Sequence, residues 1–111
     1  MFLNMFLKNI IFYFSDQQRY DTVNEELTPN LIQLAREGVT FHNNITCQPV
    51  CGPARACLQT GRYATQLGCN FNGIPLPSDS KTLAHYFNNA GYQTAYIGKW
   101  HLASNRLPNI G

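Results

Sequence analysis

The sequence lacks any strong excess of charge. Its 111 residues carry a formal net charge of +2, and no basic run occurs along the chain. The charge therefore gives no argument for nucleic acid or an anionic membrane as a partner. The chain also contains no internal repeat and no low-complexity tract. Because 44% of the residues are hydrophobic, the composition is instead typical of a chain that folds around a core.

Signals for a membrane or for secretion are also missing. No window of the sequence approaches the length of a membrane-spanning helix. The apolar residues 1–7 are followed by Lys8, whereas a secretory signal carries its positive charge first, then a longer apolar core and a small-residue cleavage site. We therefore expect a cytoplasmic location and no membrane partner.

The four cysteines follow neither a zinc-binding nor a disulfide pattern. They are Cys47, Cys51, Cys57 and Cys69, and no pair has the Cys-x-x-Cys spacing of zinc knuckles or thioredoxin-like sites. Without a secretion signal, a disulfide framework is also not expected. A set in which one cysteine is chemically special fits this spacing better.

Strands that alternate with helices indicate an α/β fold. The strands are predicted over residues 9–15, 39–41 and 93–97, and the first is a continuous run of β-branched and aromatic residues of the kind buried on both faces. Each of the first and last strands ends in polar residues. In open α/β sheets, ligands bind at this end of the strands.

Two amphipathic helices are predicted between these strands. The first is expected to have Thr28 as its N-cap, Pro29 as its first residue and Gly38 after its end. The second is expected over residues 81–90, capped by Ser80 or Asp79. Residues 62–77 contain several glycines and prolines, so they are expected to be irregular.

The stretch from Cys51 to Gly61 is typical of a loop that enters a helix. A helix that starts near Pro53 or Ala54 would place Cys51 beside unpaired backbone N–H groups, at the positive end of the helix dipole. Arg55 would add a cation and a planar set of donors suited to sulfate-like or phosphate-like oxygens. The alternative is an inert cysteine at a turn. Local physics alone leaves the two interpretations open.

Two further groups of polar residues are candidates for a site. Asp16 and Gln17 carry hard oxygen ligands suited to calcium, magnesium or manganese, although an aspartate after a strand often only caps a turn. Lys99 and His101 lie two residues apart, so on an extended segment both would face one ligand. Their alternative is an ordinary polar loop packed on Trp100.

Taken together, these stretches resemble the formylglycine-dependent sulfatases of the alkaline phosphatase-like superfamily. Cys51 to Arg55, followed by Leu58 to Arg62, is similar to the family signature Cys-x-Pro-Ser/Ala-Arg-x-x-Leu-x-Thr-Gly. Gly91 to Leu102 resembles the second signature, and Asn9 to Arg19 resembles the opening strand and metal-binding turn. The resemblance implies an alkaline phosphatase-like α/β/α sandwich with a mixed, mostly parallel sheet.

The resemblance also implies a catalytic mechanism. A formylglycine-generating or anaerobic sulfatase-maturating enzyme would convert Cys51 to formylglycine, whose aldehyde is hydrated to a diol. One hydroxyl of the diol attacks sulfur and expels the alcohol, and the collapse of the other to the aldehyde then expels sulfate. Arg55 and Lys99 would hold the diol and neutralise the sulfate oxygens. His101 would hydrogen-bond the diol and is a candidate for its deprotonation.

Further roles are implied for residues outside the two signatures. Asp16 and Gln17, with the group made from Cys51, would bind a divalent cation, most often calcium, that polarises the sulfate and orients the diol. Asn72 matches a position that contacts substrate in some relatives. Cys47 precedes Gln-Pro but has no arginine four positions later, so Cys51 is the residue expected to be modified.

Two departures from the family pattern affect this interpretation. Asp16-Gln17 stands where many sulfatases have two aspartates, and this form is similar to a bacterial branch that also contains phosphonate monoester hydrolases. The family domain is also several hundred residues long. Residues 1–8 are therefore interpreted as an N-terminal extension, and residues 9–111 as the N-terminal part of an incomplete catalytic domain. We expect this fragment alone to be inactive and marginally folded.

The expected function is hydrolysis of a sulfuric ester by the full-length protein. One alternative is a phosphonate or phosphate ester hydrolase of the same superfamily. Another is a non-catalytic truncated remnant that only binds anions or a partner. The expected partners are a sulfate ester and the maturation enzyme, with no nucleic acid.

Overall fold

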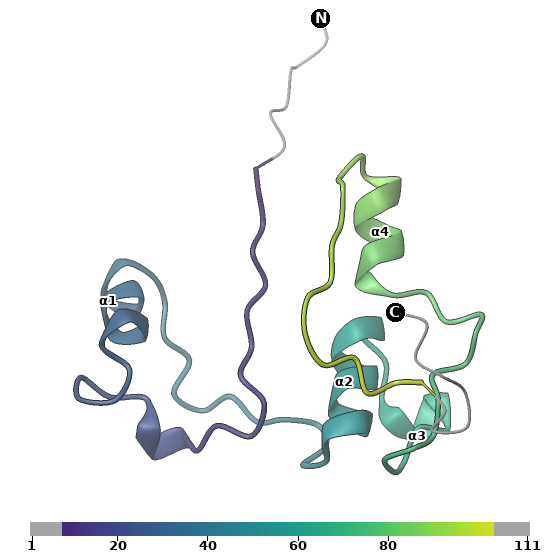
Figure 1. Ribbon diagram of the computed structural model, residues 1–111, viewed down its shortest axis with the longest axis horizontal. Helices are drawn as coiled ribbons and strands as arrows, with labels where there is room; N and C mark the ends of the chain where they lie inside the picture. Colours follow the sequence, from purple (N-terminus) through teal and green to yellow (C-terminus); the bar gives the residue numbers. More distant parts are fainter. Residues whose placement is uncertain (1–7, 104–111) are drawn as a thin grey trace, which may run out of the picture. The chain divides into compact units, whose positions relative to one another are not determined.

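The computed structural model describes residues 8–103 and contains five helical elements in that range. In chain order they are η1 (Tyr20–Thr22), α1 (Pro29–Glu37), α2 (Cys51–Thr60), α3 (Ala64–Leu67) and α4 (Leu83–Asn89) (Figure 1). The described residues divide into two compact units. One consists of Phe12–Ile45, and the other of residues 46–103 together with residues 8–11.

The three predicted strands are not formed within residues 8–103. Residues 9–15, 39–41 and 93–97 are extended or irregular and belong to no hydrogen-bonded ladder. Most of their apolar side chains are exposed, as in Ile11 at 93% and Ile97 at 96%. A strand of a parallel sheet pairs only with strands brought beside it by long crossover connections. The predicted sheet is therefore not shown by this part of the chain.

The unit formed by Phe12–Ile45 contains α1, whose bounds match the prediction. Thr28 precedes the helix and Pro29 begins it, and Gly38 follows its end. The Thr28 hydroxyl does not cap the helix but lies 3.1 Å from the backbone nitrogen of Asn24, whose N–H it accepts. Gly38 is extended, at φ −127°, and not left-handed. Leu34, an apolar residue of this helix, is 67% exposed.

The other unit is organised around α2. This helix ends at Thr60 because Gly61 adopts a left-handed conformation with φ 68°, and the Gly61 N–H donates to the Cys57 carbonyl at 2.8 Å. The buried core against α2 consists of Ala56, Leu67, Cys69 and Leu102, with Ile74 and Leu76 packed on it. The core thus joins α2 and α3 to the last described segment of the chain.

Two elements of this unit differ from the sequence prediction. The short helix α3 lies within residues 62–77, which were expected to be irregular. Helix α4 begins at Leu83, two residues later than predicted, and its cap is Thr82 and not Ser80 or Asp79. The side chain of His85 stabilises the helix start at Thr82, because its Nδ1 accepts the Thr82 backbone N–H at 3.1 Å.

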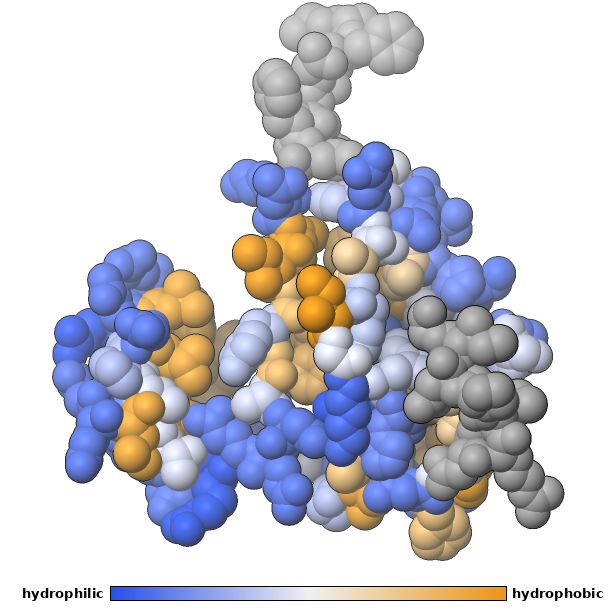
Figure 2. Space-filling model, in the orientation of Figure 1, coloured by the Kyte–Doolittle hydropathy of each residue, from blue (hydrophilic) through white to orange (hydrophobic). Residues whose placement is uncertain are grey.

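Many apolar side chains lie at the surface of the described part (Figure 2). Eight of the eighteen exposed large apolar residues in this part belong to the segments predicted as strands, and these include Ile10, Tyr13, Val39 and Phe41. Such side chains are suited to a buried sheet rather than to water.

Within residues 8–103, no helix is both long enough and apolar enough to span a bilayer.

Leu102 provides a test of the core around α2. Its side chain is 3% exposed, so Leu102→Ala removes packed apolar atoms and should lower the free energy of unfolding by about 2–5 kcal/mol. Phe71→Ala is the control, because Phe71 is 72% exposed and lies outside the segments predicted as strands. It should change the free energy of unfolding by less than about 0.5 kcal/mol. Equal effects of the two substitutions in urea unfolding would contradict this core.

Candidate active site

Cys51 is the first residue of α2. The helix begins earlier than the predicted start near Pro53 or Ala54, because Val50 is its N-cap and the Ala54 N–H donates to the Val50 carbonyl at 2.9 Å. Pro53 is accommodated because the first turn of a helix has no partner for its N–H groups. The Cys51 side chain is half-buried. The expected placement of Cys51 at the positive end of a helix is therefore confirmed.

Asn72 holds the start of α2. Its side-chain Oδ1 accepts the backbone N–H of Gly52 at 2.8 Å, so an asparagine 20 residues away satisfies one of the donors that the helix leaves open. A Cβ added at Gly52 would lie 2.8 Å from this oxygen and 3.6 Å from the His101 carbonyl. Glycine at position 52 thus leaves room for the hydrogen-bonded Asn72 side chain, whereas the His101 carbonyl would be at ordinary van der Waals distance.

Arg55 is buried within α2 and contacts the second motif. The residue is 6% exposed, and its Nη1 donates to the Tyr96 hydroxyl at 3.0 Å and to the Lys99 carbonyl. The Tyr96 hydroxyl in turn donates to the same Lys99 carbonyl at 2.6 Å. These hydrogen bonds place the backbone of Lys99 beside α2, as Figure 1 shows for the segment that returns from α4.

His101 has two unusual features. Its φ of 58° lies in the left-handed region, which costs a non-glycine residue roughly 1–2 kcal/mol. Its Nδ1 is buried and has no hydrogen-bond partner among residues 8–103. Buried polar atoms are nearly always hydrogen-bonded in folded proteins. The strain and the buried nitrogen both mark His101 as a functional candidate.

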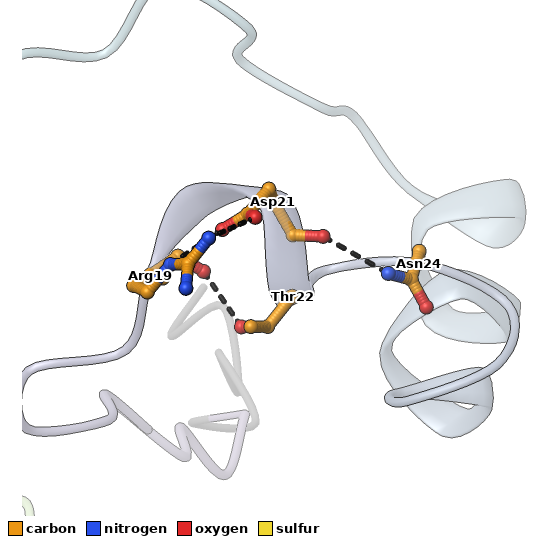
Figure 3. Close-up of polar contacts among 4 residues, drawn as sticks. All are labelled: Arg19, Asp21, Thr22 and Asn24. Atoms are coloured by element: carbon orange, nitrogen blue, oxygen red, sulfur yellow. Dashed lines mark hydrogen bonds and ion pairs between the residues drawn. The ribbon is translucent and has the colours of Figure 1, made fainter.

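The predicted metal-binding turn lies in the unit formed by Phe12–Ile45. Gln17 has a φ of 62° and is, with His101, one of the two non-glycine residues with positive φ in the described range. The turn leads into η1, where local contacts fix the chain (Figure 3). Arg19 forms an ion pair with Asp21, and the Asn24 side chain donates to the Asp21 carbonyl at 2.9 Å. The Asp21 carboxylate is therefore paired with the Arg19 guanidinium.

The donor chemistry of this turn fits a hard divalent cation only in part. The Asp16 carboxylate and the Gln17 amide are oxygen donors of the type that calcium prefers. Among residues 8–103, however, no group of three or more histidine, cysteine, aspartate or glutamate side chains is placed to hold a metal. Asp16 and Gln17 also belong to a different unit from Cys51. Their convergence with Cys51 on one metal remains a prediction.

Cys57 and Cys69 are poor candidates for a nucleophile. Burial raises the pKa of Cys57, and a hydrogen bond with Cys47 that favours the protonated Cys57 thiol raises it further. Burial also raises the pKa of Cys69. A buried thiol with a raised pKa forms little of the reactive thiolate near neutral pH. All four cysteines are free, and only Cys51 occupies the start of a helix.

A hollow of about 440 Å³ lies at the opposite end of α2 and is not the predicted site. It is lined by Thr60, the last residue of α2, and by residues of the segment that leads into α4, among them Asp79 and Lys81. At 1.5 Å per residue, about 13 Å of helix separates Thr60 from Cys51. The predicted site residues lie around the start of the helix instead.

The structure brings most of the predicted site residues together. Cys51 and Arg55 lie on α2, Asn72 contacts the start of that helix, and the backbones of Lys99 and His101 pass beside it. Sequence reasoning missed Tyr96, which contacts Arg55 directly. The available signal was a tyrosine hydroxyl at the end of a predicted strand, three residues before Lys99.

Comparisons with known proteins agree with the two motifs. The family model described as Sulfatase matches residues 8–107. The chain is 51% identical over 75 residues to an uncharacterised sulfatase, YidJ, of Escherichia coli K12, covering 68% of this chain and 15% of the relative. It is 42% identical over 103 residues to an ulvan-active sulfatase of Formosa agariphila, covering 88% and 20%.

A third relative shows the same pattern of coverage. This N-acetylglucosamine-6-O-sulfatase of Bacteroides thetaiotaomicron is 38% identical over 101 residues, covering 86% of this chain and 18% of the relative. The chain thus spans 15% to 20% of the length of these three relatives. No solved structure matches the chain.

The contact between Asn72 and Gly52 generates a stability prediction. Asn72→Ala removes the acceptor at the start of α2 and should lower the free energy of unfolding by about 1 kcal/mol. Asn72→Asp keeps the acceptor and adds a negative charge near the helix start, so it should retain stability. Asn70→Ala, at an exposed position two residues earlier, is the control. If Asn72→Ala unfolds at the same urea concentration as Asn70→Ala, the capping role is wrong.

Proposed function

The chain belongs to the sulfatase family, and on that basis we propose that the full-length protein hydrolyses sulfuric esters. The observation that carries the proposal is the placement of Cys51 at the start of α2, with Arg55 one turn later on the same side of the helix. Both residues belong to the first family signature. The phosphonate or phosphate ester alternative has no support from the three relatives described above, because each is named a sulfatase.

The proposed fold is the alkaline phosphatase-like α/β/α sandwich, to which residues 9–111 would contribute the N-terminal part. The segments 9–15, 39–41 and 93–97 would then become strands when later parts of the full-length protein supply their neighbours. Their exposed apolar side chains support this proposal, since a sheet covered by helices on both faces would bury them.

The proposed reactive group is formylglycine made from Cys51. In that conversion the side-chain methylene carbon of Cys51 is oxidised by two electrons to an aldehyde, and the sulfur leaves as sulfide. The maturation enzyme would supply the oxidant, which is molecular oxygen or an anaerobic electron acceptor. When hydrated, the group supplies the hydroxyl that attacks sulfur and the electron pair that releases sulfate.

The cationic residues around α2 have distinct proposed roles. Arg55 is fixed by its hydrogen bonds to Tyr96 and the Lys99 carbonyl, so its charge needs no reorganisation when negative charge develops on the sulfate. Lys99 would contribute a second cation at the sulfate oxygens. His101 would accept a proton from residue 51, and its buried Nδ1 supports such a role. Asn72 would position the start of α2 and contact substrate.

A divalent cation, most often calcium in this family, would complete the site. Asp16 and Gln17 would provide oxygen ligands to it, with residue 51 as a third ligand. Magnesium or manganese would accept the same ligands. When bound, the cation would polarise the sulfate.

Maturation of Cys51 provides the first test. After co-expression of the full-length protein with a formylglycine-generating enzyme, its intact mass should fall by about 18 Da, because the thiol group and one hydrogen of Cys51 are replaced by a carbonyl oxygen. The converted protein should release 4-nitrophenol from 4-nitrophenyl sulfate. Cys51→Ala should abolish both the mass change and the turnover, whereas the matched control Cys47→Ala should retain both.

Three results would count against this proposal. An unconverted Cys51 in the presence of the maturation enzyme would favour a non-catalytic remnant. Turnover of an aryl phosphonate monoester in preference to 4-nitrophenyl sulfate would favour the phosphonate hydrolase. Retention of activity by Cys51→Ala would show that another residue is the nucleophile.

A further inference from the structure

A buried arginine needs an acceptor framework to hold its orientation. Arg55 is 6% exposed, and removing a cation from water costs several kcal/mol unless polar partners replace the water. The guanidinium is also planar, so hydrogen bonds to one of its nitrogens restrict the orientation of the whole group. The residues that contact this nitrogen therefore determine where the positive charge of Arg55 points.

Tyr96 and the Lys99 carbonyl supply such a framework. Both oxygens accept hydrogen bonds from Arg55 Nη1, and the Tyr96 hydroxyl donates to the Lys99 carbonyl. The three groups thus form a closed triangle of hydrogen bonds. Because the hydroxyl accepts from one partner and donates to the other, its two bonds reinforce each other. Removal of this single oxygen would break two sides of the triangle.

The Tyr96 ring is itself held in place. It meets the Trp100 ring edge-on, with centroids 5.1 Å apart and an interplanar angle of 84°. Aromatic pairs in this geometry contribute about 0.5–1.5 kcal/mol beyond burial. The segment that carries Lys99 therefore fixes the ring at one end and the hydroxyl at the other. A phenylalanine at position 96 would keep the ring contact and lose only the hydroxyl.

We propose that Tyr96 is a positioning residue, which orients the Arg55 guanidinium toward residue 51 and the sulfate group of the substrate. The proposal rests on the proposed function, because the orientation of Arg55 affects catalysis only if a sulfate group binds beside residue 51. Arg55 lies four residues after Cys51 on α2, so the two side chains share one side of the helix. Tyr96 acts through Arg55 and not on the substrate itself.

The kinetic test compares Tyr96→Phe with wild type in the matured full-length protein. With 4-nitrophenyl sulfate as substrate, kcat/KM per converted residue 51 should fall about tenfold. In an Arg55→Lys background, which lacks the planar group, the same substitution should change kcat/KM less than about twofold. Tyr92→Phe is the matched control, because the Tyr92 ring packs on Phe87. It should retain wild-type kcat/KM.

A second measurement does not depend on catalysis. In the full-length protein with nitrogen-15-labelled arginine, NMR should show slow hydrogen exchange at the Arg55 guanidinium, and Tyr96→Phe should accelerate it at least about tenfold. Unchanged exchange, or an equal loss of kcat/KM in both Arg55 backgrounds, would overturn the positioning role. If exchange responds as expected but wild type does not hydrolyse the sulfate, the proposed function is wrong and the contact between Tyr96 and Arg55 is correct.

Discussion

The site depends first on the hydrogen bonds of one buried cation. Arg55 Nη1 donates to the Tyr96 hydroxyl and to the Lys99 carbonyl, and these contacts join two motifs that lie more than 40 residues apart in the sequence. A buried guanidinium without such acceptors would be strongly destabilising. The contacts that satisfy the buried Arg55 therefore also hold the backbone of Lys99 beside α2, the helix that begins at Cys51.

The start of α2 also depends on a contact with a residue distant in the sequence. Glycine at position 52 leaves room for the Asn72 side chain, which accepts the backbone N–H of this residue next to Cys51. The two described non-glycine residues with positive φ, Gln17 and His101, are both residues for which the family resemblance implies a role. Strained backbone persists where the surrounding structure or a ligand compensates for it. This coincidence supports the roles proposed for the Asp16–Gln17 turn and for the second motif, which belong to separate units.

Local signals in the sequence predicted the helices better than the strands. Pro29 and Gly38 correctly bounded α1, and the motif around Cys51 predicted α2 with its start displaced by two or three residues. The cap of α4 was missed because it depends on the His85 side chain. The strands depend on neighbours distant in sequence, which residues 8–103 do not supply. Arg55 was recognised as a site residue, but its contact with Tyr96 arises only in three dimensions.

A crystal structure of the matured full-length protein with calcium tests the central claim most directly, namely that Cys51 organises a sulfatase site with the Asp16–Gln17 turn. The account predicts formylglycine at position 51 and a calcium ion about 2.3–2.6 Å from oxygens of Asp16, Gln17 and residue 51. An unmodified cysteine at position 51, with Asp16 too distant to share a metal with it, would contradict the account.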